Sequence, residues 1–337
     1  MKKVSVIIPC FNATKYLPKC FMSLVQQTIG IDQIELIFVD DASTDEDATW
    51  NMLQEFERAY PESIMILKLE ENMRQGGARN VALQYATGEY IAFVDADDFV
   101  SENFLLETYE KAKESDADII QFEYFYYTDR LGAVDSGRNI TPEVIEISSV
   151  SDRKKFLISE KVTYGCWNKL YRHDLLKSAH TAYAEHVIYE EPLFVYPLLY
   201  FADKIVILND AYYYYRQNDS GTMRNDMRQE ETLKMHADVQ LAVWNFMKKT
   251  PFFKEYYDEI KLYFLHTYLY ETLYFAKLRG FKLSYAFYKE LEKTVITEVP
   301  DYDESTYSAL IPKQMELYRM IEEGMTEEKF GGYWERL

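Results

Sequence analysis

Residues 90–98, Tyr90-Ile-Ala-Phe-Val-Asp-Ala-Asp-Asp98, decide the fold class, because a short apolar run leads directly into three carboxylates. Such a run is typical of a buried strand in a parallel sheet. Asp95 and Asp97 stand two residues apart at its end, so both side chains can lean to the same side. Two carboxylates in this place suit Mg²⁺ or Mn²⁺, with substrate phosphates completing the coordination shell. The alternative is an acidic turn that caps a helix expected from Ser101.

Two further expected strands also end in polar clusters. The run Val4-Ser-Val-Ile-Ile8 leads into Pro9-Cys-Phe-Asn12, and Ile34-Glu-Leu-Ile-Phe-Val39 leads into Asp40-Asp41. Helical spacing separates the strands, and this alternation predicts a doubly wound α/β fold with a mostly parallel sheet. Ligands bind such sheets at the carboxyl ends of the strands. The three polar clusters therefore predict a binding site at that edge.

Apolar periodicity and capping residues place the other elements. Asn12 or Thr14 is expected to cap the first helix, and Thr44 or Asp45 the second. Glycines and a proline predict a loop over 128–150. The remaining elements expected here are strands over 64–69, 118–127, 205–208 and 212–215, and helices over 75–86 and 101–114.

The pattern changes after about residue 225. Apolar residues such as Leu233, Leu241, Leu262 and Leu269 follow helical spacing, and no further strand ends in an acidic cluster. We therefore expect a catalytic domain over 1–225 and a helical domain over 226–337. The aromatic density of the second domain is compatible with a packed bundle or with a surface for acceptor binding or oligomerisation.

The chain has 337 residues and a formal net charge of −19. This charge repels nucleic acid and anionic membrane surfaces, so an anionic substrate would need a local metal ion, an arginine or helix N-termini. Three scattered cysteines indicate no disulfide framework. Neither a signal peptide nor an apolar stretch of membrane length is visible. We expect a cytoplasmic protein, with peripheral membrane association only through partners.

Several nucleotide-binding motifs are missing. The cluster after the first strand, Pro9-Cys-Phe-Asn12, is not the glycine-rich fingerprint of a nicotinamide dehydrogenase, and no Walker-type phosphate loop occurs. A nucleotidyltransferase also places carboxylates on a doubly wound sheet, but it would want a glycine-rich, basic loop that residues 11–19 do not supply. Nucleotidyl transfer and a non-catalytic module that binds sugar nucleotides remain the alternatives.

Several ordered motifs resemble the family 2 glycosyltransferases of the GT-A fold, a doubly wound, mixed-sheet α/β fold. The resemblance covers about residues 1–225. The matching motifs are residues 4–12, Phe38-Val-Asp-Asp-Ala-Ser-Thr-Asp45, Ala78-Arg-Asn80, Phe93-Val-Asp-Ala-Asp-Asp98, Trp167-Asn-Lys-Leu-Tyr-Arg172, Glu190-Glu191 and Tyr214-Tyr-Arg216.

The resemblance implies roles for the matching residues. Asp41 and the backbone near Pro9 would hold a uracil-type base, and Asp97, with Asp95, would bind the Mn²⁺ or Mg²⁺ that bridges the donor diphosphate. Arg216 is expected to bring positive charge to the diphosphate. The donor-binding set is Pro9, Phe11, Asn12, Asp40, Asp41, Arg79, Asp95, Ala96, Asp98 and Arg216.

The catalytic base is expected in the pair Glu190-Glu191. The family usually has Asp at the second position, so Glu191 takes that role here and Glu190 is the second choice. A carboxylate there would take the proton of the acceptor hydroxyl in a single inverting displacement. Trp167 and Lys169 are expected either to shape the acceptor side or to serve the fold.

The sequence therefore predicts a metal-dependent inverting glycosyltransferase. The expected donor is a UDP-hexose carrying glucose, galactose or an N-acetyl derivative. The expected acceptor is a glycan, a glycoprotein or a lipid-linked molecule. A homodimer through the aromatic C-terminal region is a further expectation.

Overall fold

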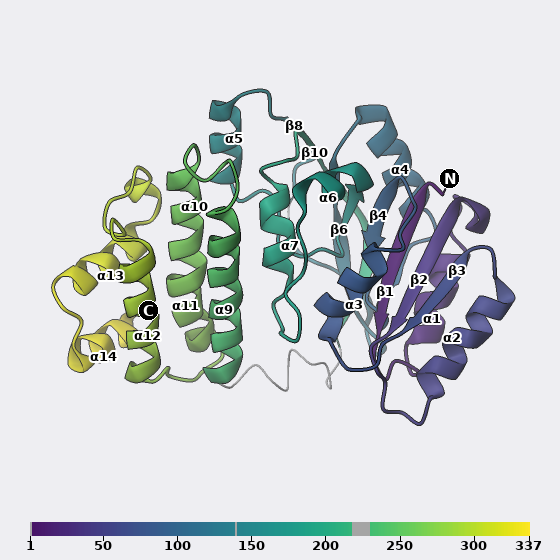
Figure 1. The fold of residues 1–337 in the computed structure, drawn as a ribbon, viewed down its shortest axis with the longest axis horizontal. Coiled ribbons are helices and arrows are strands. Elements are labelled where there is room, and N and C mark those ends of the chain that lie inside the picture. Colours follow the sequence, from purple (N-terminus) through teal and green to yellow (C-terminus); the bar gives the residue numbers. More distant parts are fainter. Residues whose placement is uncertain (1, 139, 218–229) are drawn as a thin grey trace. The chain divides into compact units, whose positions relative to one another are not determined.

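The computed structural model describes residues 2–138, 140–217 and 230–337 (Figure 1). The chain forms two compact units, Met1–Asp219 and Ser220–Leu337. The domain boundary expected between residues 225 and 226 lies outside the described residues. Each unit is considered by itself below.

The first unit is built on one mixed sheet, with the strand order β3-β2-β1-β4-β9-β6-β10-β5. Strands β1 to β4 are parallel, as the sequence predicts, and β9 joins β4 to β6 in antiparallel pairings. The strands are β1 (Val4–Cys10), β2 (Ile34–Asp40), β3 (Ile64–Lys68), β4 (Tyr90–Phe93), β5 (Phe99–Val100), β6 (Ile119–Thr128), β9 (Lys169–Arg172) and β10 (Lys204–Arg216).

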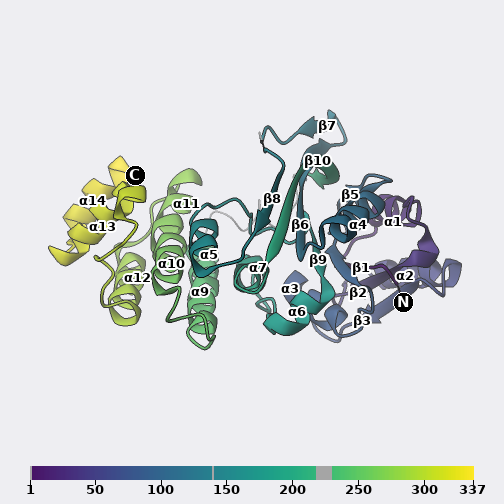
Figure 2. The same ribbon diagram turned by 90° about the horizontal axis from the view of Figure 1, so that it is seen from above.

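Helices cover both faces of this sheet (Figure 2). Helices α1 (Leu17–Val25), α2 (Ala48–Ala59) and α4 (Phe104–Ser115) pack on the face of Val4, Val6 and Ile8. Helices α3 (Arg74–Leu83), α6 (His173–Ala179) and α7 (Glu191–Leu198) lie on the other. There Phe93 meets Phe194 edge to face, with ring centroids 5.5 Å apart. Burial of both faces explains why the strands are continuously apolar.

The stretch 128–150 is not the loop that the sequence predicts. It contains β7 (Gly132–Asp135), which pairs with β6, and β8 (Glu143–Glu146), which pairs with β10, and the helix α5 (Val150–Leu157) follows. Both strands have only four residues. Strand β7 folds back on β6 as a hairpin, whereas β8 pairs with β10, which is distant in sequence. The expected strands over 205–208 and 212–215 are one strand, β10, with irregular register between Ile207 and Tyr213. A bulge absorbs the polar residues there without ending the strand.

The predicted cap of the first helix is wrong, whereas that of the second helix is confirmed in part. The residue before α1 is Tyr16, whose side chain makes no capping bond. Asn12 instead bonds to Thr44 in the neighbouring loop. Helix α2 begins only at Ala48, although Asp45 does accept a hydrogen bond from the amide of Thr49, at 3.1 Å.

The second unit is helical, as predicted. Trp244 stacks on Phe264 at 4.9 Å between centroids, and Leu233, Leu269 and Leu273 are fully buried, so the unit has its own core. A π-helical turn over Leu265–Glu271 interrupts the regular spacing. None of the helices in the described ranges is long and apolar enough to cross a membrane. The α-helices of the second unit are α9 (Glu230–Met247), α10 (Tyr257–Phe264), α11 (Thr272–Leu278), α12 (Tyr285–Glu298), α13 (Pro312–Glu322) and α14 (Glu327–Arg336).

Candidate active site

Asp98 anchors the carboxylate cluster that follows β4. It is almost completely buried, and it accepts hydrogen bonds from the Tyr213 hydroxyl at 2.7 Å and from the Arg216 amide at 2.6 Å. The same Tyr213 hydroxyl accepts a hydrogen bond from the amide of Asp95. Burial, with Asp97 and Asp95 nearby, raises the pKa of Asp98 well above its usual value. The end of β10 therefore holds the acidic turn in place.

Arg79 joins Asp95 to Glu190. Its guanidinium lies 2.6 Å from an oxygen of each carboxylate, and its side chain is only 1% exposed. The sequence predicts contact between Arg79 and the donor, whereas in the structure the guanidinium is enclosed by protein carboxylates. These ion pairs do not test the predicted contact of Arg79 with the donor. Helix α3 supplies Arg79, and Glu190 comes 111 residues later in the chain.

A glycine allows this close approach. A Cβ atom on Gly76 would stand 2.2 Å from the carbonyl oxygen of Ala184 and 3.0 Å from the Cβ of Glu190. The backbone before Glu190 is itself unusual, because Tyr189 has a φ of 68°. A tyrosine rarely adopts this left-handed conformation, and such residues concentrate at functional sites. Close packing on α3 thus fixes the segment that leads to both glutamates.

Glu191 has a different environment from Glu190. Its Oε1 accepts a hydrogen bond from the amide of Cys166 at 2.7 Å. Burial, followed by the charge of Glu190, raises the pKa of Glu191 to about 7, although Arg79 and the Cys166 amide oppose the shift. A carboxylate with such a pKa is suited to accept a proton near neutral pH.

Lys169 holds the loop that contains Cys166. Its ammonium donates to the Thr163 hydroxyl at 3.0 Å, the Gly165 carbonyl at 2.6 Å and the Asn168 side chain at 2.8 Å. The side chain is fully buried, and burial lowers its pKa to about 7 while the charge of Glu191 raises it. Lys169 therefore stabilises the loop whose Cys166 amide donates to Glu191.

Asp41 lies at the other end of the site. Its Oδ1 accepts a hydrogen bond from the amide of Met73 at 2.7 Å, and burial raises its pKa to about 6. Next to it, Leu69, Glu70, Glu71 and Met73 line a hollow of about 490 Å³. This is the place where the family resemblance predicts the base of the nucleotide.

The neighbouring predicted donor residues surround the ends of β1 and β2. Asp40 is fully buried, with one oxygen bonded to the Ser43 amide and the other without a partner among the described residues. Phe11 is 46% exposed, so its ring is open to a ligand. Pro9 is buried in β1, whereas Asn12 has a φ of 48° and bonds to the loop after β2.

Arg216 lies against the acidic turn. Its Nε donates to the carbonyl oxygen of Asp97 at 2.8 Å, and its guanidinium pairs with Asp129 and packs on the ring of Tyr16. The predicted contact of Arg216 with a diphosphate is not tested by these contacts. They place its positive charge beside Asp97.

The residues of the turn fit a divalent cation. Asp97 and Asp95 are partly exposed oxygen donors two residues apart, and Arg79 occupies only the Oδ1 oxygen of Asp95, whereas Asp98 and Ala96 are buried. Within the described residues, no three His, Cys, Asp or Glu side chains form a ready-made metal cage. Mg²⁺ commonly takes one or two protein carboxylates and completes its shell with substrate phosphates.

The sequence did not point to three of these contacts. They are the Tyr213 hydroxyl between Asp95 and Asp98, the Met73 amide at Asp41, and the Cys166 amide at Glu191. The last two use backbone groups, which any residue supplies. A signal for Tyr213 exists in the aromatic run 212–215, but it does not reveal which tyrosine faces the carboxylates.

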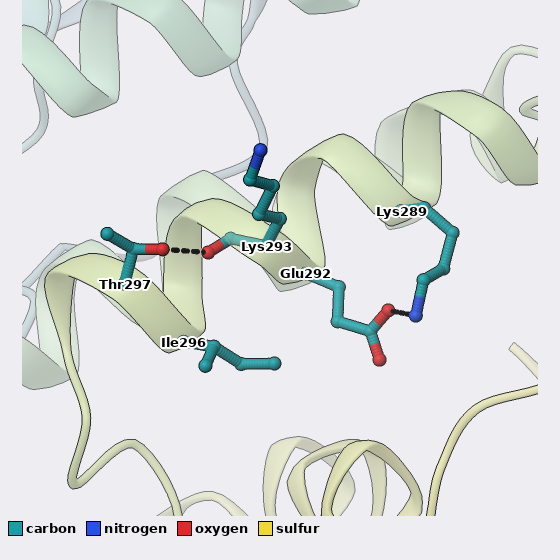
Figure 3. Close-up of a pocket in the computed structure, with 5 residues that line it drawn as sticks. All are labelled: Lys289, Glu292, Lys293, Ile296 and Thr297. Atoms are coloured by element: carbon teal, nitrogen blue, oxygen red, sulfur yellow. Dashed lines mark hydrogen bonds and ion pairs between the residues drawn. The ribbon is translucent and has the colours of Figure 1, made fainter.

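The second unit has a shallow hollow on α12 (Figure 3). The close-up shows Lys289 paired with Glu292 and the Thr297 hydroxyl bonded to the carbonyl of Lys293. Ile296 completes the lining. The polar groups of Lys289, Glu292 and Thr297 are thus partnered within α12. The residues that line the hollow include no cluster of acids like that of the first unit.

Comparisons with known proteins agree with this geometry. The family described as glycosyl transferase family 2 matches residues 5–179. Glycosyltransferase GlyG of Streptococcus pneumoniae is 31% identical over 66% of this chain and 73% of GlyG. The poly(ribitol-phosphate) β-glucosyltransferase of Bacillus spizizenii is 29% identical over 63% of this chain, which spans only 32% of that protein.

A solved structure shows the same fold. The crystal structure of Staphylococcus aureus TarS 1-349 in complex with UDP superposes with a TM-score of 0.71 at 22% identity, over 98% of this chain and 89% of that one. The predicted GT-A fold with a helical C-terminal region is thus confirmed. The chain is a glycosyltransferase and belongs to glycosyl transferase family 2.

Proposed function

We propose that this enzyme transfers a hexose from a UDP-sugar to a hydroxyl of a glycan, glycoprotein or lipid-linked acceptor, with inversion at the anomeric carbon. TarS has been solved with UDP and with UDP-GlcNAc, which supports a uridine donor here. Asp41 and the adjoining hollow would receive the base. Membership of glycosyl transferase family 2 argues against the nucleotidyltransferase alternative.

The different partners of Glu190 and Glu191 are the main support for the proposal. Arg79 pairs with Glu190 at 2.6 Å and thereby commits that carboxylate to the fold. Glu191 has no such cation at its oxygens among the contacts described, only the Cys166 amide, and its pKa is about 7. We assign the base to Glu191 and a supporting role to Glu190.

The reaction then follows in a single displacement. The acceptor oxygen attacks the anomeric carbon as Glu191 takes its proton, while the bond from that carbon to the donor phosphate breaks and UDP leaves. A cation held by Asp97 and Asp95 would neutralise charge on the leaving diphosphate. Asp98, fixed by Tyr213 and Arg216, keeps the acidic turn at the required place.

The test uses the full chain and a panel of UDP-hexoses with MnCl₂, and it measures release of UDP. Asp97→Ala is expected to abolish metal-dependent release, and Glu191→Gln to retain UDP binding while losing transfer. Unchanged turnover in Asp97→Ala would refute the metal assignment. If Glu190→Gln loses transfer and Glu191→Gln does not, the base is Glu190.

A further inference from the structure

Five aromatic side chains form a continuous wall next to the carboxylates. They come from three neighbouring parts of the sheet. The members of this aromatic wall are Tyr213 and Tyr215 of β10, Tyr124 and Tyr126 of β6, and Trp167, which precedes β9. Tyr213 pairs with Tyr124 and Tyr215 with Tyr126 in the strand register, and alternation along each strand puts all four on one face.

Ring contacts link the members of the wall. Trp167 lies 4.7 Å from Tyr213 and 5.3 Å from Tyr215, and Tyr124 meets its edge at 4.8 Å. Tyr126 extends the wall, with its centroid 5.4 Å from that of Tyr124. The rings therefore support one another and present a rigid surface.

The wall runs from the reaction centre to the surface. At its inner end the Tyr213 ring is fully buried and its hydroxyl donates to Asp98. Burial raises the pKa of Tyr215 well above its usual value, and the charges of Asp98, Asp95, Asp97 and Glu191 add to this rise. At the outer end Tyr126 is 38% exposed. A ligand lying on the wall would thus extend from the proposed base toward solvent.

The increase in exposure from Tyr213 to Tyr126 argues against a purely structural role for the aromatic wall. Trp167, Tyr124 and Tyr215 are only partly buried, and the Tyr124 and Tyr126 hydroxyls lie 3.4 Å apart at the exposed end. An exposed aromatic patch beside a reaction centre is a common binding surface. Pyranose rings combine a C–H face, which packs on aromatic rings, with hydroxyls at the edge, which can reach phenolic groups.

We propose that the aromatic wall is the acceptor subsite, and that it takes a terminal pyranose of a neutral glycan. The charge around the wall favours a neutral occupant. The wall adjoins Asp97 and Glu191, and Arg138, a cation whose charge acts on Tyr124, is already paired with Glu123 at 3.6 Å. A polyol phosphate chain would be repelled there. This inference rests on the proposed function.

The experiment measures binding and transfer separately. Saturation-transfer NMR with the full chain and UDP detects binding of methyl β-hexosides, lactose and diacetylchitobiose, and a ribitol phosphate oligomer is the charged comparison. Steady-state transfer then gives the acceptor KM and the donor KM. The variants are Tyr126→Ala and Trp167→Leu. The control is Tyr85→Ala, because Tyr85 is also exposed, at 47%, but follows α3 and lies outside the wall.

We expect a neutral pyranoside to bind the wild type, and Tyr126→Ala to raise the acceptor KM about fivefold to tenfold, the value of one lost aromatic contact. The donor KM should change much less, and Tyr85→Ala should resemble the wild type. The proposal is overturned if no neutral pyranoside binds, if only the phosphate oligomer is used, or if both wall variants keep the wild-type acceptor KM. Failure of the proposed function is distinguishable, because the wild type would then neither bind UDP nor turn over any UDP-hexose.

Discussion

Replacing Arg79 by methionine tests the central ion pairs of the site. Methionine keeps much of the apolar volume of the arginine stem but removes its charge. Two carboxylates then lose a cation at 2.6 Å: Asp95, whose side chain is 14% exposed, and Glu190, which is 8% exposed. A buried carboxylate without its partner is costly, because neither water nor another cation replaces the lost contact.

The magnitude follows from this burial. Breaking a buried pair by removing one partner costs about 3–5 kcal/mol. In a unit of this size each kcal/mol lowers the melting temperature by about 2–4 °C, so Arg79→Met should lower it by about 6–20 °C. The matched control is Lys68→Met, which removes an exposed pair with Asp47. Exposed pairs contribute about 0–1 kcal/mol, and the loss should shrink further in high salt.

Differential scanning calorimetry of the full chain is the assay. The shift should fall on the transition that UDP stabilises, which marks the unit that holds the site. The reasoning is refuted if Arg79→Met lowers that transition no more than Lys68→Met does. It is also refuted if the whole shift disappears at high salt, since a buried pair is screened much less than an exposed one.

Four further predictions concern the base and its support. If Glu191 is the base, kcat/KM should fall as the pH drops below about 7. The raised pKa of Glu191 also means that the folded state binds a proton that the unfolded state has lost, so its contribution to wild-type stability should fall as the pH rises from about 4.5 to about 7. Urea titrations should show a flatter dependence of stability on pH in Glu191→Gln. Lys169→Met should move the acidic limb of the kcat/KM profile to higher pH, because a positive charge that favours ionised Glu191 is lost; an unmoved limb would contradict this. Gly76→Ala should destabilise by about 1–3 kcal/mol through overpacking, whereas Gly331→Ala in α14, with only the tip of Lys282 near its Cβ, should not. Glu191→Asp should lower kcat despite restoring the usual residue of the family.

The part of the fold that follows local rules could be predicted from the sequence. Strands β1, β2 and β4 are largely apolar runs buried on both faces, and each of them ends in a polar cluster. The sequence does not predict strands β7 and β8, because each has only four residues and β8 pairs with β10, which is distant in sequence. Local pattern therefore predicts the parallel half of the sheet better than the half with antiparallel pairings.

The same distinction holds within the candidate site. Its acidic members lie next to one another in sequence and could be named in advance. The contacts that separate their roles could not: Arg79 meets Glu190 across 111 residues, and Tyr213 meets Asp98 across 115. Choosing between two adjacent glutamates requires knowing which one is already paired, and only the folded chain provides that.

The family resemblance predicts aspartate where this chain has Glu191, and the structure gives a physical reason for the glutamate. Helix α7 begins at Glu191, so its backbone position is set by the helix and by the packing of the preceding segment on Gly76. From there the carboxylate reaches the amide of Cys166 at 2.7 Å. Aspartate would withdraw the carboxylate by about 1.5 Å, one carbon–carbon bond, and stretch this contact beyond hydrogen-bonding distance. The longer side chain thus matches the position of the Lys169-supported loop.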